Sequence, residues 1–158
     1  RVYSSAFSPI PDSSAALPLV KPPLMREHRL YQADWLLRFY GFEVNEIASA
    51  APGGNLDLAV DPKLAWALAN RHLFPVDVNR ADRETLLRIP GLGTKTVARV
   101  LATRRHRTLR WEDLQRMGAN LKHARPFITL LDWRPRALAD EENLRARFAP
   151  PPEQLSLL

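Results

Sequence analysis

The sequence predicts a mainly α fold in which two helical hairpins follow a helical layer and an extended, proline-rich segment. Three observations predict it: apolar residues recur at helical spacing, glycines and prolines interrupt them at short intervals, and one interrupted unit has a degraded copy downstream. With 158 residues, 46% of them hydrophobic, the chain can bury the core of one ordinary domain or two small ones. No stretch approaches the roughly 18 consecutive apolar residues of a membrane helix, so we expect no membrane partner.

Residues 1–24 are expected to form an extended segment. Five of the 14 prolines lie between Pro9 and Pro23, and proline lacks the N–H group that helices and sheets use. The first seven residues are compatible with a short strand, the remnant of a preceding domain. The chain starts with Arg1 and shows no signal-peptide pattern, so we expect it to be part of a longer protein.

Residues 25–76 are expected to form a helical connector. Apolar residues recur at helical spacing over Arg26–Tyr40, and the polar cluster Arg26–Arg29 at its start is interpreted as a solvated first turn. Asp61 precedes a proline, a pattern typical of a helix N-cap, and the helix that it opens is expected to run to about His72.

Residues 77–131 carry the most informative segment, Ile89-Pro90-Gly91-Leu92-Gly93-Thr94-Lys95, between helices expected over 82–88 and 94–105. Pro90 ends the first helix, and Gly91 and Gly93 can adopt positive φ at little steric cost. We expect Thr94 to cap the second helix, whose first N–H groups are unpaired and carry partial positive charge. Such a turn can bind an anion through its backbone.

A weaker copy of this unit follows, with helices expected over 111–117 and 122–128. Its turn keeps one glycine, Gly118, and places Asn120 where the first turn has Gly93. Asparagine tolerates left-handed backbone geometry better than most residues. The repeat predicts that the two units pack pseudo-symmetrically and bury faces that neither could bury alone.

Positive charge concentrates around the two units. The chain has a net charge of +6, but residues 77–136 hold 14 Lys/Arg against 6 Asp/Glu, which favours a polyanionic partner. Cysteine is absent from the sequence, which excludes disulfides and iron–sulfur ligation within it and is compatible with the cytoplasmic location that we expect. Residues 132–158 are polar and are expected to form a partly disordered tail. The core is expected to be anchored by four tryptophans, Trp35, Trp66, Trp111 and Trp133.

Val78-Asn79-Arg80-Ala81-Asp82, Leu86 and the turn that follows resemble the helix-hairpin-helix family over residues 77–105. The resemblance implies a tandem helix-hairpin-helix domain, SAM-domain-like, that binds DNA phosphates without reading base sequence. The DNA-binding residues that it implies are Gly91, Leu92, Gly93, Thr94, Lys95, Thr96, Arg99, Gly118, Asn120, Lys122 and Arg125. Some members also hold a monovalent cation on hairpin carbonyls, which correspond here to those of Leu87, Ile89 and Leu92.

A second resemblance covers residues 1 to about 136. Tyr3–Pro11 and Pro22–Phe42 resemble the C-terminal part of bacterial radical S-adenosylmethionine proteins assigned to DNA modification or repair. It implies that a 4Fe-4S cluster and S-adenosylmethionine are bound in a parent's upstream barrel, and that this chain holds no cofactor. The implied function is a DNA-binding module that delivers substrate to the missing N-terminal radical enzyme domain and performs no catalysis itself.

Two alternatives stay open. The same turn resembles that of helix-hairpin-helix DNA glycosylases, in which a lysine at the position of Lys95 attacks the sugar, and Asp113 lies at about the distance of their catalytic aspartate. The proline-rich stretch upstream leaves little room for the helices that hold a flipped base in those enzymes. The other alternative is a protein-interaction domain, which would bind the barrel or a uracil-DNA glycosylase-like protein.

Overall fold

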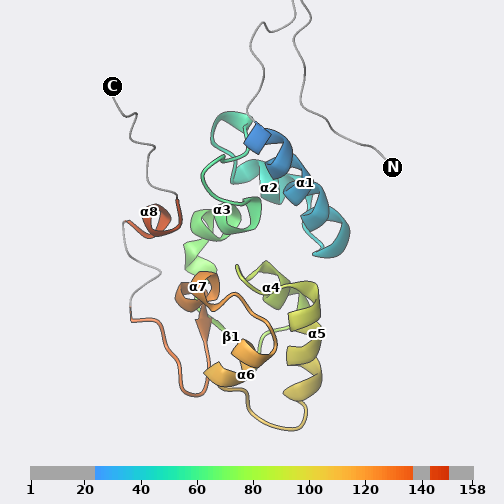
Figure 1. Ribbon diagram of the computed structural model, residues 1–158, viewed down its shortest axis with the longest axis vertical. Helices are drawn as coiled ribbons and strands as arrows, with labels where there is room; N and C mark the ends of the chain where they lie inside the picture. Colours follow the sequence, from blue (N-terminus) through green and yellow to red (C-terminus); the bar gives the residue numbers. More distant parts are fainter. Residues whose placement is uncertain (1–23, 137–142, 150–158) are drawn as a thin grey trace, which may run out of the picture.

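The computed structural model describes residues 24–136 and 143–149, and this part of the chain is mainly α-helical (Figure 1). The helices are α1 (Leu24–Phe39), α2 (Val44–Ser49), α3 (Pro62–Ala69), α4 (Arg83–Arg88), α5 (Thr94–Thr103), α6 (Trp111–Arg116), α7 (Leu121–Ala124) and α8 (Leu144–Phe148). Three short 3-10 helices are η1 (Pro52–Gly54), η2 (Arg71–Leu73) and η3 (Arg125–Phe127). The expected extended segment lies almost wholly outside the described residues. None of the described helices is long and apolar enough to cross a membrane.

Helices α1, α2 and α3 form an N-terminal layer above the two hairpins (Figure 1). The predicted cap of α3 is confirmed, because the Asp61 carboxylate accepts the N–H of Leu64 at 3.0 Å. The predicted solvated first turn of α1 is wrong at Arg29, which is only 9% exposed and donates to the carbonyl of Leu58 at 3.0 Å. This contact joins residues 29 positions apart, so a local pattern could not indicate it.

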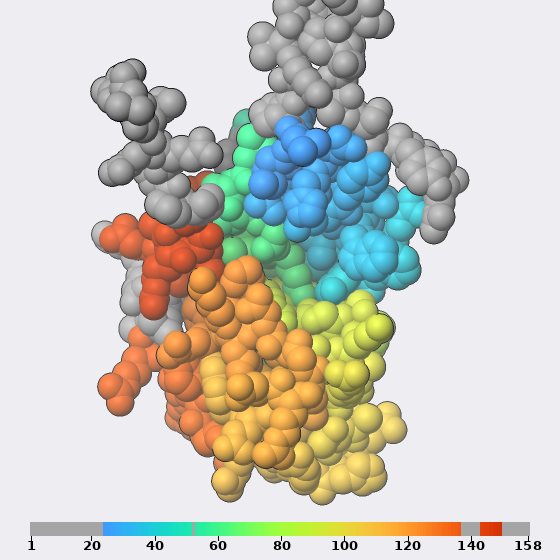
Figure 2. Space-filling model, viewed as in Figure 1, coloured from blue at the N-terminus to red at the C-terminus, as the bar shows by residue number. Residues whose placement is uncertain are grey.

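The hairpin region contains two pairs of helices joined by a turn, α4–α5 and α6–α7, at the predicted positions. The helix expected over 122–128 is shorter than predicted, because α7 ends at Ala124 and is followed by η3 and by a strand that begins at Ile128. A parallel pair of two-residue strands, β1 (Val76–Asp77) and β2 (Ile128–Thr129), joins the segments that flank the two units. Figure 2 shows the yellow and orange residues of this region packed as one body against the green and blue residues of the N-terminal layer.

A chain of edge-to-face aromatic contacts connects the two parts of the core. Phe42 and Trp66 lie 5.6 Å apart between ring centroids, Trp66 and Phe74 6.3 Å, and Phe74 and Phe127 5.0 Å. Phe127, which lies in η3 directly after the second hairpin, is fully buried. Each such pair contributes about 0.5–1.5 kcal/mol beyond the apolar area that it buries. These contacts therefore fix the N-terminal layer against the hairpins.

The tryptophan prediction is only partly correct. Trp66 is buried, and Trp111 and Trp133 contact each other at 4.6 Å on the margin of the core, but Trp35 is 56% exposed. Trp35 lies on the solvent side of α1, where it packs against Phe39 at 4.3 Å.

The region expected to be a partly disordered tail contains a packed helix, α8. Leu144 is completely buried, and Arg145 pairs with Asp57 of the N-terminal layer at 2.6 Å. The Arg145 guanidinium and two backbone N–H groups hold the pKa of the Asp57 carboxyl below its usual range despite partial burial, which acts in the opposite direction. A five-residue helix with one buried leucine has too short a pattern to be predicted from periodicity.

Candidate nucleic-acid interface

The first turn, Ile89–Gly93, connects α4 to α5. Asp82 caps α4 as predicted, accepting the N–H of Thr85 at 2.9 Å. Gly91 adopts φ +84°, and a Cβ there would collide with the backbone carbonyl of Asn120. Position 91 therefore requires glycine for two reasons: the backbone has positive φ, and the second hairpin leaves no space for a side chain.

The second glycine of the first turn, Gly93, differs from the prediction in its backbone conformation and in its position relative to α5. Gly93 has φ −86°, so it needs no left-handed freedom, and it is Gly93 and not Thr94 that occupies the N-cap of α5. Thr94 is the first helical residue. The expected side-chain cap is therefore absent from α5. A Cβ at Gly93 would make only ordinary contact, 3.7 Å from the Tyr40 hydroxyl.

The N-terminus of α5 consequently presents unpaired donors. The N–H groups of Thr94, Lys95 and Thr96 have no acceptor among the described residues, and neither does that of Gly93. They lie at the positive end of a ten-residue helix. The Lys95 side chain is exposed beside them. This arrangement can bind an anion through several converging N–H groups and one ammonium group.

The second turn, Met117–Asn120, repeats the geometry of the first. Gly118 has φ +83°, matching Gly91, and Asn120 occupies the N-cap of α7, matching Gly93. The expected left-handed geometry of Asn120 is wrong, because its φ is −78°. Its backbone N–H donates to the carbonyl of Gly91 at 2.8 Å, and its side-chain oxygen accepts the N–H of His123 at 3.4 Å. The backbone N–H of Asn120 thus joins the two turns, and its side chain caps α7.

Two further predicted DNA-binding residues also join the hairpins. The Thr96 hydroxyl, which is buried, donates to the carbonyl of Met117 at 3.3 Å. Arg99, an exposed residue, donates to the same carbonyl at 2.9 Å. Both bonds satisfy the C-terminal end of α6. Of the predicted basic residues, Lys95 and Lys122 are exposed, and Arg125 lies with its guanidinium 5.1 Å from the ring centroid of Trp133.

Several other arginines in the basic region are engaged inside the protein. Arg104 donates to the carbonyls of Val78 and Ala81, at 3.0 and 2.6 Å. Arg88 pairs with Glu46 of α2 at 2.9 Å, and this pair holds the pKa of the Glu46 carboxyl below its usual range even though burial opposes the shift. The charge count of the sequence therefore overstates the positive charge available to a ligand.

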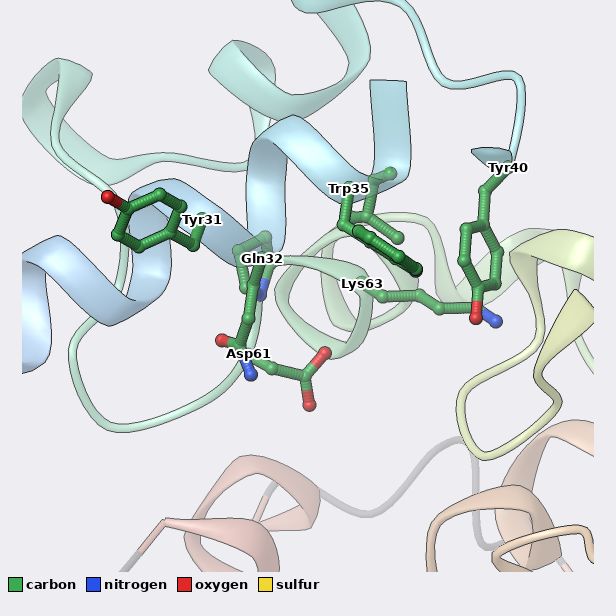
Figure 3. Close-up of a pocket in the computed structure, with 8 residues that line it drawn as sticks. Tyr31, Gln32, Trp35, Tyr40, Asp61 and Lys63 are labelled. Atoms are coloured by element: carbon green, nitrogen blue, oxygen red, sulfur yellow. The ribbon is translucent and has the colours of Figure 1, made fainter. Parts of the chain in front are cut away.

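Lys63 on α3 is the residue that sequence reasoning missed. Its side chain is almost completely buried, and Nζ donates to the carbonyl oxygen of Leu92, in the first turn, at 2.6 Å. Figure 3 shows the side chain passing beneath Trp35 toward Tyr40, whose ring centroid lies 4.6 Å from Nζ. Burial lowers the pKa of Lys63 to about 7, and Asp61 opposes this shift. The available signal was a single charge within the otherwise apolar stretch Pro62–Ala69.

Lys63 forms part of the wall of an open cavity of about 320 Å³. Its remaining walls come from α1, the residue after it and the start of α3: Tyr31, Gln32, Trp35, Leu36, Tyr40, Asp61 and Pro62. Comparisons of the chain with models of known protein families, with curated proteins and with solved structures found no match.

Two of the three carbonyls expected to hold a monovalent cation already accept a hydrogen bond. The Leu92 oxygen already accepts the Lys63 amino group, and the Ile89 oxygen accepts the N–H of Leu92 at 3.2 Å. Each of these oxygens keeps a second lone pair, so the cation site stays a prediction. Among the described residues, no group of His, Asp or Glu side chains is arranged to hold a metal ion.

Asp113, the weak catalytic candidate, is engaged in packing the second hairpin. Its carboxylate accepts two bonds from Arg107, at 2.6 and 2.9 Å, and one from the N–H of Arg110 at 2.9 Å. The Arg107 guanidinium holds the pKa of the Asp113 carboxyl below its usual range. Lys95 is exposed on α5, and no contact joins it to Asp113. The two candidates are therefore not organised as a nucleophile and its partner.

Proposed function

We propose that this chain binds DNA without reading its base sequence, by holding a backbone phosphate at the first turn. The observation that carries the proposal is the uncapped start of α5, where the N–H groups of residues 93–96 have no acceptor among the described residues and Lys95 is exposed beside them. Phosphate oxygens satisfy such donors, and the helix dipole favours their charge.

The relation between the two turns supports a tandem helix-hairpin-helix arrangement of the SAM-domain-like type. Gly91 and Gly118 share positive φ, and each is followed two residues later by a helix N-cap. In this proposal the first turn holds the phosphate, and the second braces it through Asn120. Lys122 and Arg125, both exposed, supply charge on the second hairpin.

The resemblance to radical S-adenosylmethionine proteins extends the proposal to a cytoplasmic parent that modifies or repairs DNA. In that parent, the 4Fe-4S cluster and S-adenosylmethionine belong to a separate catalytic domain. The residues described here would grip the DNA and present it to that domain. Such a division accounts for the composition of the site. The N–H donors of α5 lie beside an exposed lysine and, among the described residues, that lysine is not paired with an acidic partner for catalysis.

Fluorescence anisotropy with labelled duplexes of unrelated sequence tests the proposal. We expect similar affinities for all of them, and a log–log salt slope of roughly −4 to −5 if four to six phosphates are contacted. Lys95→Glu should weaken binding to every duplex and make the slope shallower by about 1. Arg26→Glu, which makes the same change of charge at the far end of α1, is the matched control. The proposal fails if no duplex binds at low salt, or if the two variants weaken binding equally.

A further inference from the structure

Lys63 occupies a position that its packing alone does not explain. Its side chain is 8% exposed, and the Leu92 carbonyl is the acceptor of its amino group. Burying an amino group costs free energy, and an apolar side chain of similar volume often serves stability as well or better. The contact with the first turn is the feature that an apolar residue could not reproduce.

We propose that Lys63 is a positioning residue for the phosphate site, because its amino group fixes the Leu92–Gly93 peptide so that the Gly93 N–H faces outward. The phosphate site itself rests on the proposed function. A peptide unit is planar and trans, so its C=O and N–H groups point in opposite directions. Holding the Leu92 oxygen toward α3 therefore directs the Gly93 N–H away from α3.

The first turn has little else to hold this peptide. No backbone N–H group among the described residues donates to the Leu92 oxygen, and Gly93 has no side chain to restrict rotation. Glycine loses more conformational freedom on ordering than any other residue. One bond from outside the turn, made by a residue 29 positions away, supplies the missing restraint.

The surroundings strengthen that bond. The Tyr40 ring lies 4.6 Å from Nζ, and the Lys63 side chain is buried. Hydrogen bonds are stronger in such a water-poor environment, and a donor on the carbonyl oxygen polarises the peptide so that its N–H becomes a better donor. In this proposal Lys63 restrains the turn from within the protein, so the turn should need no bound ion.

Lys63→Met tests the proposal because methionine fills similar space without a donor. With the variant folded by circular dichroism, we expect about tenfold weaker duplex binding, the loss typical of one good hydrogen bond. The salt slope should stay unchanged, because Lys63 positions a donor and does not itself contact phosphate. The Gly93 amide resonance should also move in the DNA-free protein. Lys63→Arg, which keeps a donor, should restore part of the affinity.

Lys63→Ala allows a second test by chemical rescue. Propylammonium matches the part of lysine that alanine lacks, and it should restore binding severalfold in this variant. Tetramethylammonium, which has no N–H donor, should not do so at equal ionic strength. Wild-type binding should respond equally to the two ions, and should not change when K⁺ replaces Na⁺.

The outcomes separate the two proposals. If the wild-type protein binds DNA, and Lys63→Met binds equally well or with a slope shallower by about one phosphate, the positioning role is overturned while the proposed function stands. If the wild-type protein binds no DNA, the proposed function fails. An unmoved Gly93 resonance in Lys63→Met would overturn the positioning role in either case.

Discussion

The two turns share a backbone geometry and differ in what they do with it. Each has a glycine of positive φ, Gly91 or Gly118, followed two residues later by a helix N-cap. At the second turn the N-cap is Asn120, whose side chain occupies a donor of α7 and whose N–H binds the first turn. At the first turn the N-cap is Gly93, which leaves the donors of α5 open. The two turns therefore differ in their free N–H donors: among the described residues, those of α5 are open, whereas one of those of α7 is occupied by the Asn120 side chain.

The largest expected effect comes from removing the close approach between the turns. Gly91→Ala should destabilise the protein by about 3 kcal/mol, because its Cβ would collide with the Asn120 carbonyl and its φ of +84° disfavours any side chain. Gly118→Ala has the same φ penalty but open space, with Arg99 3.9 Å away, so it should cost only about 1–2 kcal/mol. Urea unfolding measures both, and equal losses would show that the turns do not pack as described.

An asparagine N-cap in the first turn, like that of the second turn, should remove the difference in open N–H donors between α5 and α7. Gly93→Asn places a capping side chain where φ is already −86°, and it should raise stability by a few tenths of a kcal/mol. The same side chain would occupy one of the open donors, so duplex affinity should fall about tenfold. Unfolding and anisotropy measurements on one sample check both. Gly93→Ala, which adds no acceptor, is the control, and an equal loss of affinity there would indicate a steric cause.

Removing the cap of the second turn should affect stability and not the donors of α5. Asn120→Ala loses the bond to the His123 N–H, which should cost about 1 kcal/mol of unfolding free energy. The backbone bond to Gly91 remains, so the first turn should stay in place and duplex affinity should change little. A loss of affinity comparable to that of Lys95→Glu would show instead that the second turn contacts DNA directly.

The second hairpin should also show a pH dependence that comes from Asp113. The pKa of Asp113 is lowered in the folded state by Arg107, so the stabilisation is present above the carboxyl's ordinary pKa and is lost as pH falls through the lowered value. Urea unfolding from pH 7 down to pH 2 should therefore show wild type and Asp113→Asn converging in acid. A stability difference that stays constant across this range would mean that Arg107 does not stabilise the charged form.

Local patterns predicted the helices and the turn positions but not the contacts between them. Asp61 and Asp82 were identified as caps because a cap is read from adjacent residues. The short helices α2 and α8 were missed because five or six residues do not establish a period. Lys63 was missed because its partner, Leu92, becomes a neighbour only once α3 packs on the hairpin. Thr94 was preferred to Gly93 as a cap on residue type, whereas the backbone conformation placed the helix start one residue earlier.

The parallel pairing of Val76 with Ile128 brings the two ends of the hairpin region together. A segment whose ends meet can be transplanted into a surface loop of another protein at small cost in loop-closure entropy. Such a graft of residues 76–129 would carry both turns but leave Lys63 behind, since that lysine belongs to α3. The transplanted turn would then lack the hydrogen bond from Lys63 to the Leu92 carbonyl, so a graft compared with the intact protein would separate the properties of the turn from those of its support in α3.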